Sequence, residues 1–267
     1  MIPNIIHFIY GMEESNSKKE FIFPYYLSIF SSYLVNNPEK IYIYYYYQPY
    51  GIWWDKLKEI SVVEFVKVDL PTHIGRHTIE KTTHRADKLR MDILYKVGGI
   101  YMDIDTISIR PYKELLQYKT VLGLEYACKK GIVDKENYKG ICNAVLLTEP
   151  GSDFFTEWLK LYEKWFKPKG WAEASIFLPK KIADEKFKNN GRIKILSPEY
   201  FFTPHWTEVN KIFIDNYNIP EKLITLHYWS TTSHHLYKKI KNWDWINNNS
   251  HTLFGKIMLK LHKLYAS

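Results

Sequence analysis

The stretch HRADKLRMDILYKVGGIYMDIDTISIR, residues 84–110, decides the fold of this chain. Its first half is predicted to form a helix with one buried face, because apolar residues recur at helical spacing. These residues are Ala86, Leu89, Ile93 and Val97. Gly98 and Gly99 follow them, where a left-handed helix cap is expected. The chain then enters a strand at Ile100, so the stretch predicts a helix, a glycine stop and a strand.

The predicted strand carries two aspartates, Asp103 and Asp105, with one residue between them. In an extended chain their carboxylates point to one face of the strand, while Ile104 points to the other. Two neighbouring carboxylates repel each other unless a cation lies between them. A hard divalent metal shared with phosphate oxygens serves this purpose best. The other interpretation is a pair of solvated loop residues, since Asp-x-Asp is a common pattern.

The preceding helix adds a second charged pair, Asp87 and Arg90, three residues apart. Such a pair can be a plain surface ion pair. It can also offer a carboxylate to a ribose hydroxyl and a guanidinium to a phosphate. A helix with this pair, a Gly-Gly turn and an acidic strand end is a more specific combination than any of its parts, and it favours a metal and phosphate site.

Two runs in this region, ADKLR (86–90) and LYKVGGIYMDID (94–105), resemble the Asp-x-Asp sugar-binding region of glycosyltransferase family 32. That group includes capsule and surface-polysaccharide transferases, and it is similar to the catalytic domains of large clostridial glucosylating toxins. The opening run IPNIIHFIY (2–10) resembles the first strand of the family. The resemblance covers residues 1–11 and 84–115 and is weaker near Cys142-Asn143 and His227–Trp229. It implies a GT-A fold, a UDP- or GDP-sugar donor, a divalent metal (Mn²⁺ or Mg²⁺) and transfer that usually retains the anomeric configuration.

The resemblance also gives roles to individual residues. It implies that Asp105 binds the metal directly, and that Asp103 binds the ribose or sugar of the donor and the metal through a water. With Arg90, these aspartates form the expected catalytic set. His227 lies in a segment that resembles the late His-x-Trp segment of the family, with His234 in place of an expected tryptophan. An imidazole there could complete the metal shell, hold the diphosphate, or be structural.

Four residues are expected to bind the donor together with Asp103. Asp87 and Arg90 would orient it, and the resemblance implies that Tyr10 stacks on its base and that Asn143 faces the transferred sugar. Tyr10 could equally be a core residue. The amide of Asn143, inside an apolar strand, needs hydrogen-bond partners, which is consistent with a donor contact or with a structural role.

The composition limits the class of protein. The chain has 267 residues, of which 46% are hydrophobic and 25% charged, a balance typical of one large globular domain. A net charge of +8 would attract an anionic partner such as a diphosphate, a membrane surface or nucleic acid. Nucleic acid is not expected, because no nucleic-acid-binding motif is present. Cys128 and Cys142 lack metal-ligand spacing and are expected to be reduced.

The alternation of predicted strands and helices favours an α/β fold, of GT-A type by resemblance, with a mixed sheet flanked by helices. The expected strands are residues 5–10, 41–47, 62–68, 100–105, 120–126, 141–147, 192–196 and 223–228. The expected helices are residues 24–35, 53–60, 84–97, 153–166, 171–187 with a break at Pro179, and 253–265. We expect a single domain over 1–267, with a nucleotide-sugar-binding half (1–110) and an acceptor-side half (111–267) that ends in the C-terminal helix.

The expected cellular location rests on the lack of a recognisable signal peptide or membrane span in the sequence. No basic region precedes the first apolar run, and no run approaches the roughly 20 apolar residues of a membrane span. The protein is expected to be cytoplasmic, or peripheral at the membrane. The predicted helix 253–265 is amphipathic with a basic flank. Either it packs on the domain, or the flank contacts an anionic membrane that carries a lipid-linked acceptor.

Together these features predict a metal-dependent glycosyltransferase that acts on a glycan, lipid-linked or protein acceptor. A metal-dependent phosphoester hydrolase is an alternative, because phosphatases also use Asp-x-Asp, although Thr106-Ile107-Ser108 fits their loop poorly. A carbohydrate- or nucleic-acid-binding module with structural aspartates is the alternative that is not an enzyme.

Overall fold

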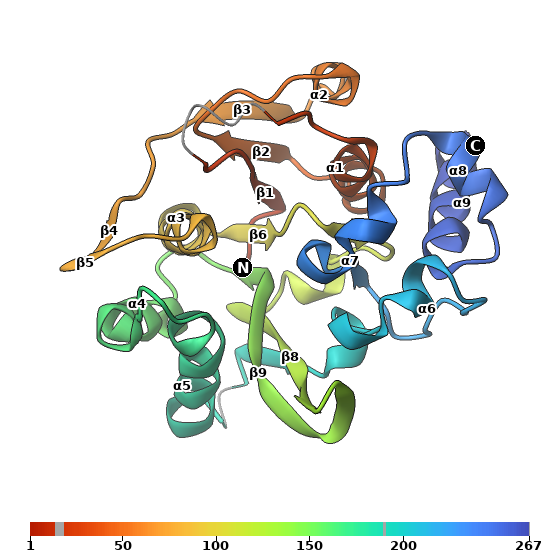
Figure 1. The fold of residues 1–267 in the computed structure, drawn as a ribbon. Helices are drawn as coiled ribbons and strands as arrows, with labels where there is room; N and C mark the ends of the chain where they lie inside the picture. The colour runs from red at the N-terminus through yellow and green to blue at the C-terminus, as the bar shows by residue number, and fades with distance from the viewer. Residues whose placement is uncertain (14–18, 189–190, 267) are drawn as a thin grey trace.

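A seven-stranded mixed sheet runs through the middle of the molecule (Figure 1). This computed structural model describes residues 1–13, 19–188 and 191–266. The strand order is β10-β8-β9-β6-β1-β2-β3, and β9 runs antiparallel to both of its neighbours while the other pairs are parallel. The strands are β1 (Ile5–Ile9), β2 (Lys40–Tyr45), β3 (Val63–Lys67), β6 (Gly99–Met102), β8 (Thr120–Lys129), β9 (Ile132–Thr148) and β10 (Ile193–Leu196).

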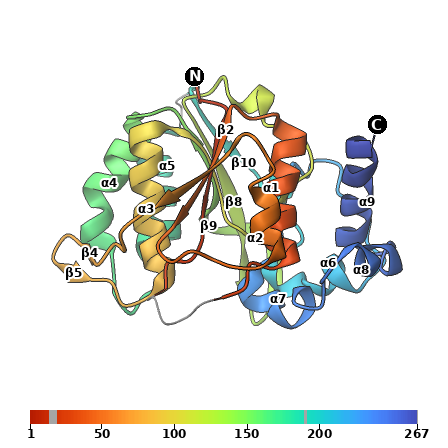
Figure 2. The same cartoon turned by 90° about the horizontal axis from the view of Figure 1, so that it is seen from above.

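Helices cover both faces of this sheet (Figure 2). One face carries α3 (Thr82–Val97), α4 (Asp153–Trp165) and α5 (Leu178–Lys186), and the other carries α1 (Phe23–Asn36) and α2 (Ile52–Leu57). Each face has its own buried apolar cluster. A third cluster joins α1 to the C-terminal helices α6 (Asn210–Phe213), α7 (Ser230–Tyr237), α8 (Trp243–Asn248) and α9 (Leu253–Ala266). The expected GT-A class, a mixed sheet flanked by helices, is confirmed.

The two glycines after α3 stop the helix as predicted, although Gly98, with a ψ of -164°, does not adopt the left-handed helical conformation expected of the cap. Gly98 has a φ of 70° and Gly99 a φ of 102°, a region of backbone space that favours glycine. A Cβ on Gly99 would lie 2.5 Å from the carbonyl oxygen of Ile5, so β6 could not approach β1 this closely with a larger residue. The glycine pair therefore sets both the end of α3 and the position of the strand that leads to the aspartates.

The prediction that the strand continues through Asp105 is wrong. β6 ends at Met102, and Asp103 and Asp105 lie in a turn that leads into a short strand, β7 (Thr106–Ser108). The turn is closed by the hydroxyl of Thr106, which donates to the carbonyl oxygen of Asp103 at 2.7 Å. The two carboxylates converge because the chain turns here, and not because of the alternation of a strand.

Other differences between the prediction and the structure concern where strands and helices begin and end. The hairpin β8–β9 extends the strands predicted at 120–126 and 141–147 to a length that pattern alone did not indicate. Its outer part is polar, and a stacked pair of tyrosines, Tyr126 and Tyr138, spans the two strands. The predicted helix 171–187 with a break at Pro179 is a π-helical segment, Glu173–Phe177, that leads directly into α5, and Pro179 lies in the first turn of α5. Residues 73–74 and 77–78, where no strand was predicted, form the small antiparallel pair β4–β5.

The C-terminal helix α9 packs into the third core cluster. Its apolar face is almost fully buried, through Leu253, Phe254, Ile257, Met258 and Leu261. On its basic flank, the Lys256 ammonium donates to the carbonyl oxygen of Tyr217 at 3.1 Å and to the side-chain oxygens of Asn216 and Asn218. The packed arrangement is the first of the two alternatives drawn from the sequence.

His7 on β1 gives the fold a dependence on pH. It is fully buried, its Nε2 donates to the carbonyl oxygen of Gly98 at 2.9 Å, and its Nδ1 lies 3.2 Å from the Tyr44 hydroxyl. Burial lowers the pKa of His7 from 6.5 to about 4, although the bond to Gly98 opposes this shift. Between those values the unfolded chain binds a proton that the folded chain does not, so the free energy of unfolding should decrease as the pH falls.

From this shift we expect His7 to remove about 3 kcal/mol of stability between pH 7 and pH 4. Urea unfolding at both pH values measures the loss. A His7→Gln variant should lose less stability over the same range, while His251→Gln, at an exposed position, should match the wild type. Equal acid sensitivity of wild type and His7→Gln would contradict this assignment. Buried His205, whose pKa burial also lowers to about 4, accounts for part of the remaining sensitivity.

Candidate active site

A cleft of about 570 Å³ opens where β6 and β1 end, beside the start of α3. All seven residues singled out from the sequence line it: Tyr10, Asp87, Arg90, Asp103, Asp105, Asn143 and His227. These residues come from positions more than 200 apart in the chain, and both expected halves, 1–110 and 111–267, contribute to the lining. The structure thus brings the seven together, and their roles remain predictions.

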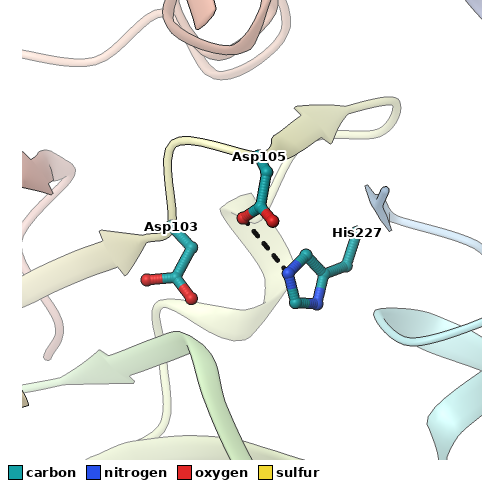
Figure 3. Close-up of side chains that lie close together, drawn as sticks. All are labelled: Asp103, Asp105 and His227. Carbon is teal, nitrogen blue, oxygen red and sulfur yellow. Dashed lines mark hydrogen bonds and ion pairs between the residues drawn. The ribbon is translucent and has the colours of Figure 1, made fainter. Parts of the chain in front are cut away.

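The pairing of β7 with a late strand, β11 (Thr225–His227), places His227 beside the acidic turn. The register opposes His227 to Thr106, and the amide of Tyr228 donates to the carbonyl oxygen of Asp105 at 2.9 Å. As a result, His227 Nε2 donates to Asp105 Oδ1 at 3.1 Å (Figure 3). Figure 3 shows Asp103 on the other side of Asp105, at the end of β6, with its carboxylate facing the same space.

Asp105 is also held by the first turn of α7. Trp229 adopts a left-handed conformation with φ 56°, and this turns the chain so that the amide of Ser230 donates to Asp105 Oδ2 at 2.6 Å. Burial would raise the pKa of Asp105, but the His227 imidazole and the Ser230 amide outweigh it and lower the pKa to about 2. Burial likewise opposes the charge on His227, while Asp105 beside it raises the pKa of His227.

Asp103, Asp105 and His227 fit a divalent cation. Each offers one ligand atom, and these atoms lie within 4.8 Å of one another. Nδ1 of His227 is buried and has no hydrogen-bond partner among the described residues. Two carboxylates and an imidazole form a donor set that suits Mn²⁺ and is compatible with Mg²⁺. The geometry is therefore consistent with the metal that the Asp-x-Asp pattern predicts.

Arg90 joins the helix to the acidic turn. Its guanidinium lies 3.2 Å from Asp103 Oδ1 and 3.2 Å from Asp87 Oδ1, and it stacks over the Tyr101 ring at 4.4 Å. It also donates to the carbonyl oxygen of Asn143 at 2.6 Å. Arg90 is 5% exposed, and these partners are all groups of the protein. The guanidinium is thus paired with two carboxylates, and the phosphate contact suggested by the sequence stays a prediction.

Asp87 and Asp103 are the carboxylates that Arg90 holds. Burial raises the pKa of each, and the guanidinium opposes that shift. Asp87 accepts a hydrogen bond from the Asn143 amide at 2.7 Å, so the buried polar group on β9 has a partner. Asp103 accepts one from the Tyr101 hydroxyl at 2.7 Å and keeps 26% of its side chain exposed. It is therefore the carboxylate of this network that remains open to the cleft.

Tyr10 lies at the end of β1, at the other side of the cleft. Its ring packs edge-on against Phe21 at 5.1 Å and against Tyr25 at 5.3 Å. It is neither fully buried nor fully exposed. The position agrees with both alternatives drawn from the sequence, a base platform and a core tyrosine.

Sequence reasoning missed part of the lining. Glu125 on β8 and Lys139 on β9 reach the cleft, as do three tryptophans, Trp171, Trp206 and Trp229. An acidic residue inside the apolar strand 120–126 was the available signal for Glu125. Lys139 lies in the hairpin extension that the pattern did not predict. Among the described residues, no helix is long and apolar enough to span a membrane.

Comparison with known proteins agrees with this geometry. Residues 31–122 match the model of the glycosyltransferase sugar-binding region containing a DXD motif. The chain is 31% identical over 225 residues to glucan organizing enzyme 1 of Cryptococcus neoformans, covering 82% of this chain and 59% of that protein. It is 29% identical over 163 residues to mannosyl phosphorylinositol ceramide synthase SUR1 of Saccharomyces cerevisiae, covering 57% and 39% respectively.

Both alignments span less than two thirds of the relative. Among solved structures, mouse xyloside xylosyltransferase 1 aligns over 83% of this chain and 96% of its own, with 9% identity and a TM-score of 0.49. The matched region 31–122 contains Asp87, Arg90 and both aspartates of the acidic turn. This chain is therefore similar to the glycosyltransferases whose sugar-binding region contains a DXD motif, the family that its sequence resembles.

Proposed function

We propose that the protein is a metal-dependent glycosyltransferase. It moves a sugar from a UDP- or GDP-sugar to a glycan, lipid-linked or protein acceptor, with retention of the anomeric configuration. The observation that carries the proposal is the convergence of Asp103, Asp105 and His227 on one space in the cleft, with both aspartates inside the matched sugar-binding region. Retention rests on the family resemblance alone.

Asp105 and His227 would hold the metal, together with Asp103 directly or through a water. Bound Mn²⁺ or Mg²⁺ would supply a Lewis acid that neutralises the leaving nucleoside diphosphate. The protein prepares this position in two ways. Asp105 is fixed by the Ser230 amide, and α7 directs its N-terminus, with residues Ser230, Thr231 and Thr232, at the cleft. The partial positive charge of a helix N-terminus favours an anionic diphosphate there.

The donor half of the cleft would extend from Tyr10 to Asn143. Tyr10 would stack on the base, and the open side of Asp103 would accept hydrogen bonds from the ribose or sugar. Asp87 and Asn143, bonded to each other, would meet the transferred sugar. Arg90 would act through Asp103 and Asp87 as a positioning residue. The printed names of two relatives, a mannosyl phosphorylinositol ceramide synthase and an inositol phosphoceramide mannosyltransferase, support a hexose as that sugar.

Calorimetry of UDP, GDP and their sugars tests the proposal, with and without Mn²⁺. We expect one nucleoside diphosphate to bind in the presence of metal and to bind at least about tenfold more weakly without it. The reason is that a bound metal would attract both the carboxylates of the site and the diphosphate. A His227→Gln variant should need a higher metal concentration for half-maximal binding. Its control is His262→Gln, on α9 and outside the cleft lining.

Three outcomes would contradict the proposal or part of it. Binding that does not depend on metal would favour a binding module with structural aspartates. Hydrolysis of a nitrophenyl phosphate in the absence of any nucleotide sugar would favour a phosphoester hydrolase. An unchanged metal titration for His227→Gln, with a large loss of melting temperature, would assign His227 to structure.

A cytoplasmic location with peripheral contact to an anionic membrane is a further part of this proposal. Its support is the basic flank of α9, where Lys260 and Lys263 are exposed. The apolar face of the helix is used by the core, so this contact would be electrostatic. We expect salt-sensitive sedimentation with anionic vesicles and none with neutral vesicles. Charge reversal at both lysines should abolish it, and equal sedimentation with both vesicle types would contradict the contact.

A further inference from the structure

The cleft also contains a charged pair that has no part in the proposed binding of the donor and the metal. Glu125 on β8 and Lys139 on β9 both line it, and Lys139 Nζ lies 3.2 Å from Glu125 Oε1. Glu125 is 2% exposed, and a buried carboxylate is costly unless it has specific partners. Among the described residues, its second oxygen, Oε2, has no hydrogen-bond partner within the protein.

The surroundings of Glu125 add a second unpartnered polar atom. Nε2 of His205 is buried, has no hydrogen-bond partner among the described residues, and lies 4.0 Å from Glu125 Oε1. Burial lowers the pKa of His205 to about 4, so the imidazole is neutral and does not balance the charge of Glu125. Lys139, 30% exposed, is therefore the cation beside this carboxylate, and its ammonium has donor capacity left for a ligand.

The walls of this part of the cleft are apolar and closely packed. Gly140 pairs with Glu125 across the hairpin, and a Cβ there would lie 2.5 Å from the side chain of Ile176. The glycine thus lets the segment Glu173–Phe177 pack directly over β9, where Ser175 and Ile176 line the cleft. Trp206 lines the cleft as well. Few polar groups between apolar walls are typical of a site that binds a small polar ring.

The pair is separated from the donor half along β9. Lys139 precedes Asn143 by four residues on this strand. Asn143 is tied to Asp87 at the donor end of the cleft. We propose that Glu125 and Lys139 form the acceptor subsite of the cleft, where the carboxylate accepts and the ammonium donates hydrogen bonds to neighbouring hydroxyls of a polyhydroxylated ring. This inference rests on the proposed glycosyltransferase function and specifies its acceptor side.

The test uses saturation-transfer NMR on the full chain with Mg²⁺ and whichever nucleoside diphosphate binds. The probes are methyl α-mannopyranoside, methyl β-glucopyranoside, methyl β-galactopyranoside and myo-inositol. We expect at least one probe to receive saturation from the wild type. Glu125→Gln and Lys139→Met should each weaken its binding about tenfold, because a hydrogen bond to a charged group is lost. Glu136→Gln, an exposed glutamate on the same hairpin, should bind the probe like the wild type.

Nucleoside diphosphate binding, measured by calorimetry on the same samples, separates this inference from the proposed function. It should be unchanged in both variants. The acceptor subsite is overturned if no probe binds the wild type, if both variants bind the probe normally, or if the variants lose the nucleotide. Glu125→Gln protects the test against misfolding, because it leaves no buried charge and its partner Lys139 is partly exposed to solvent. Failure of the wild type to bind any nucleoside diphosphate with metal would instead refute the proposed function.

Discussion

Replacing Asp105 by Asn is expected to reduce the rate of sugar transfer about a thousandfold, the equivalent of about 4 kcal/mol of transition-state stabilisation. The reason is that Asp105 is the carboxylate on which the metal site centres, with His227 on one side and Asp103 on the other. The neutral amide is a poor ligand for a hard divalent cation. Metal-dependent binding of the nucleoside diphosphate should weaken in parallel.

Asn is a better choice here than Ala because Asp105 also has a structural role. It is 6% exposed and accepts hydrogen bonds from the Ser230 amide and from His227. Removing both would leave buried donors unsatisfied, at about 1–3 kcal/mol each. The amide oxygen of Asn can still accept one of them. We therefore expect Asp105→Ala to lose stability as well as activity.

The measurement is the initial rate of transfer with Mn²⁺ and the donor identified by calorimetry, together with the urea midpoint of each variant. Asp215→Asn, at an exposed position, is the control. If Asp105→Asn kept more than about a tenth of the wild-type rate, then only ~1.4 kcal/mol of the barrier would depend on this carboxylate, and the metal role would be wrong.

The Arg90→Met variant should lose the most stability of those considered, about 3–5 kcal/mol, because it leaves buried carboxylates without their counter-ion. The guanidinium lies 3.2 Å from both Asp87 and Asp103, and Asp87 is 7% exposed. The variant also removes the stacking on Tyr101. Activity should fall with stability, since Asp103 would lose the contact that positions it.

The loss should depend on pH in a defined direction. Burial already raises the pKa of Asp87 and of Asp103, and Arg90 opposes that shift. Without Arg90 both carboxyls should hold their protons to higher pH, so the variant is relatively less stable where they must ionise. Urea unfolding should show a larger deficit at pH 8 than at pH 5. Lys88→Met is the control, because Lys88 on the same helix pairs at the surface with Asp92. A deficit below about 1 kcal/mol at both pH values would contradict a buried network.

The order of strands and helices could be predicted from the sequence because it depends on local information. Helical spacing in residues 84–97, the glycine pair that follows and the apolar runs of β1 and β2 each act over a few neighbouring residues. Asp103 and Asp105 could be identified for the same reason. The ends of strands β8 and β9 were predicted less accurately. The length of these strands is set by their pairing with each other and not by a local sequence pattern.

For some residues of the site, the sequence indicated the residue but not its contacts. His227 was singled out by resemblance, but its contact with Asp105 depends on the register of β7 and β11, which no local pattern shows. Arg90 was identified as a donor ligand, but its contacts with Asp87, Asp103 and Asn143 depend on tertiary packing, and no local pattern shows them. Lys139 lies in a segment for which the sequence shows no motif. Only its contact with Glu125 in the structure drew attention to it.

The sequence by itself determined the α/β class of the fold and the acidic pair, since periodicity, glycine position and charge spacing are properties of short segments. The family resemblance added Tyr10, Asn143 and His227. The tertiary structure decided how these segments meet. It turned Asp103 and Asp105 toward His227, enclosed Arg90 between two carboxylates, and placed Glu125 and Lys139 in the same cleft. Such contacts depend on strand register and on packing between residues distant in the chain, which short-range patterns do not encode.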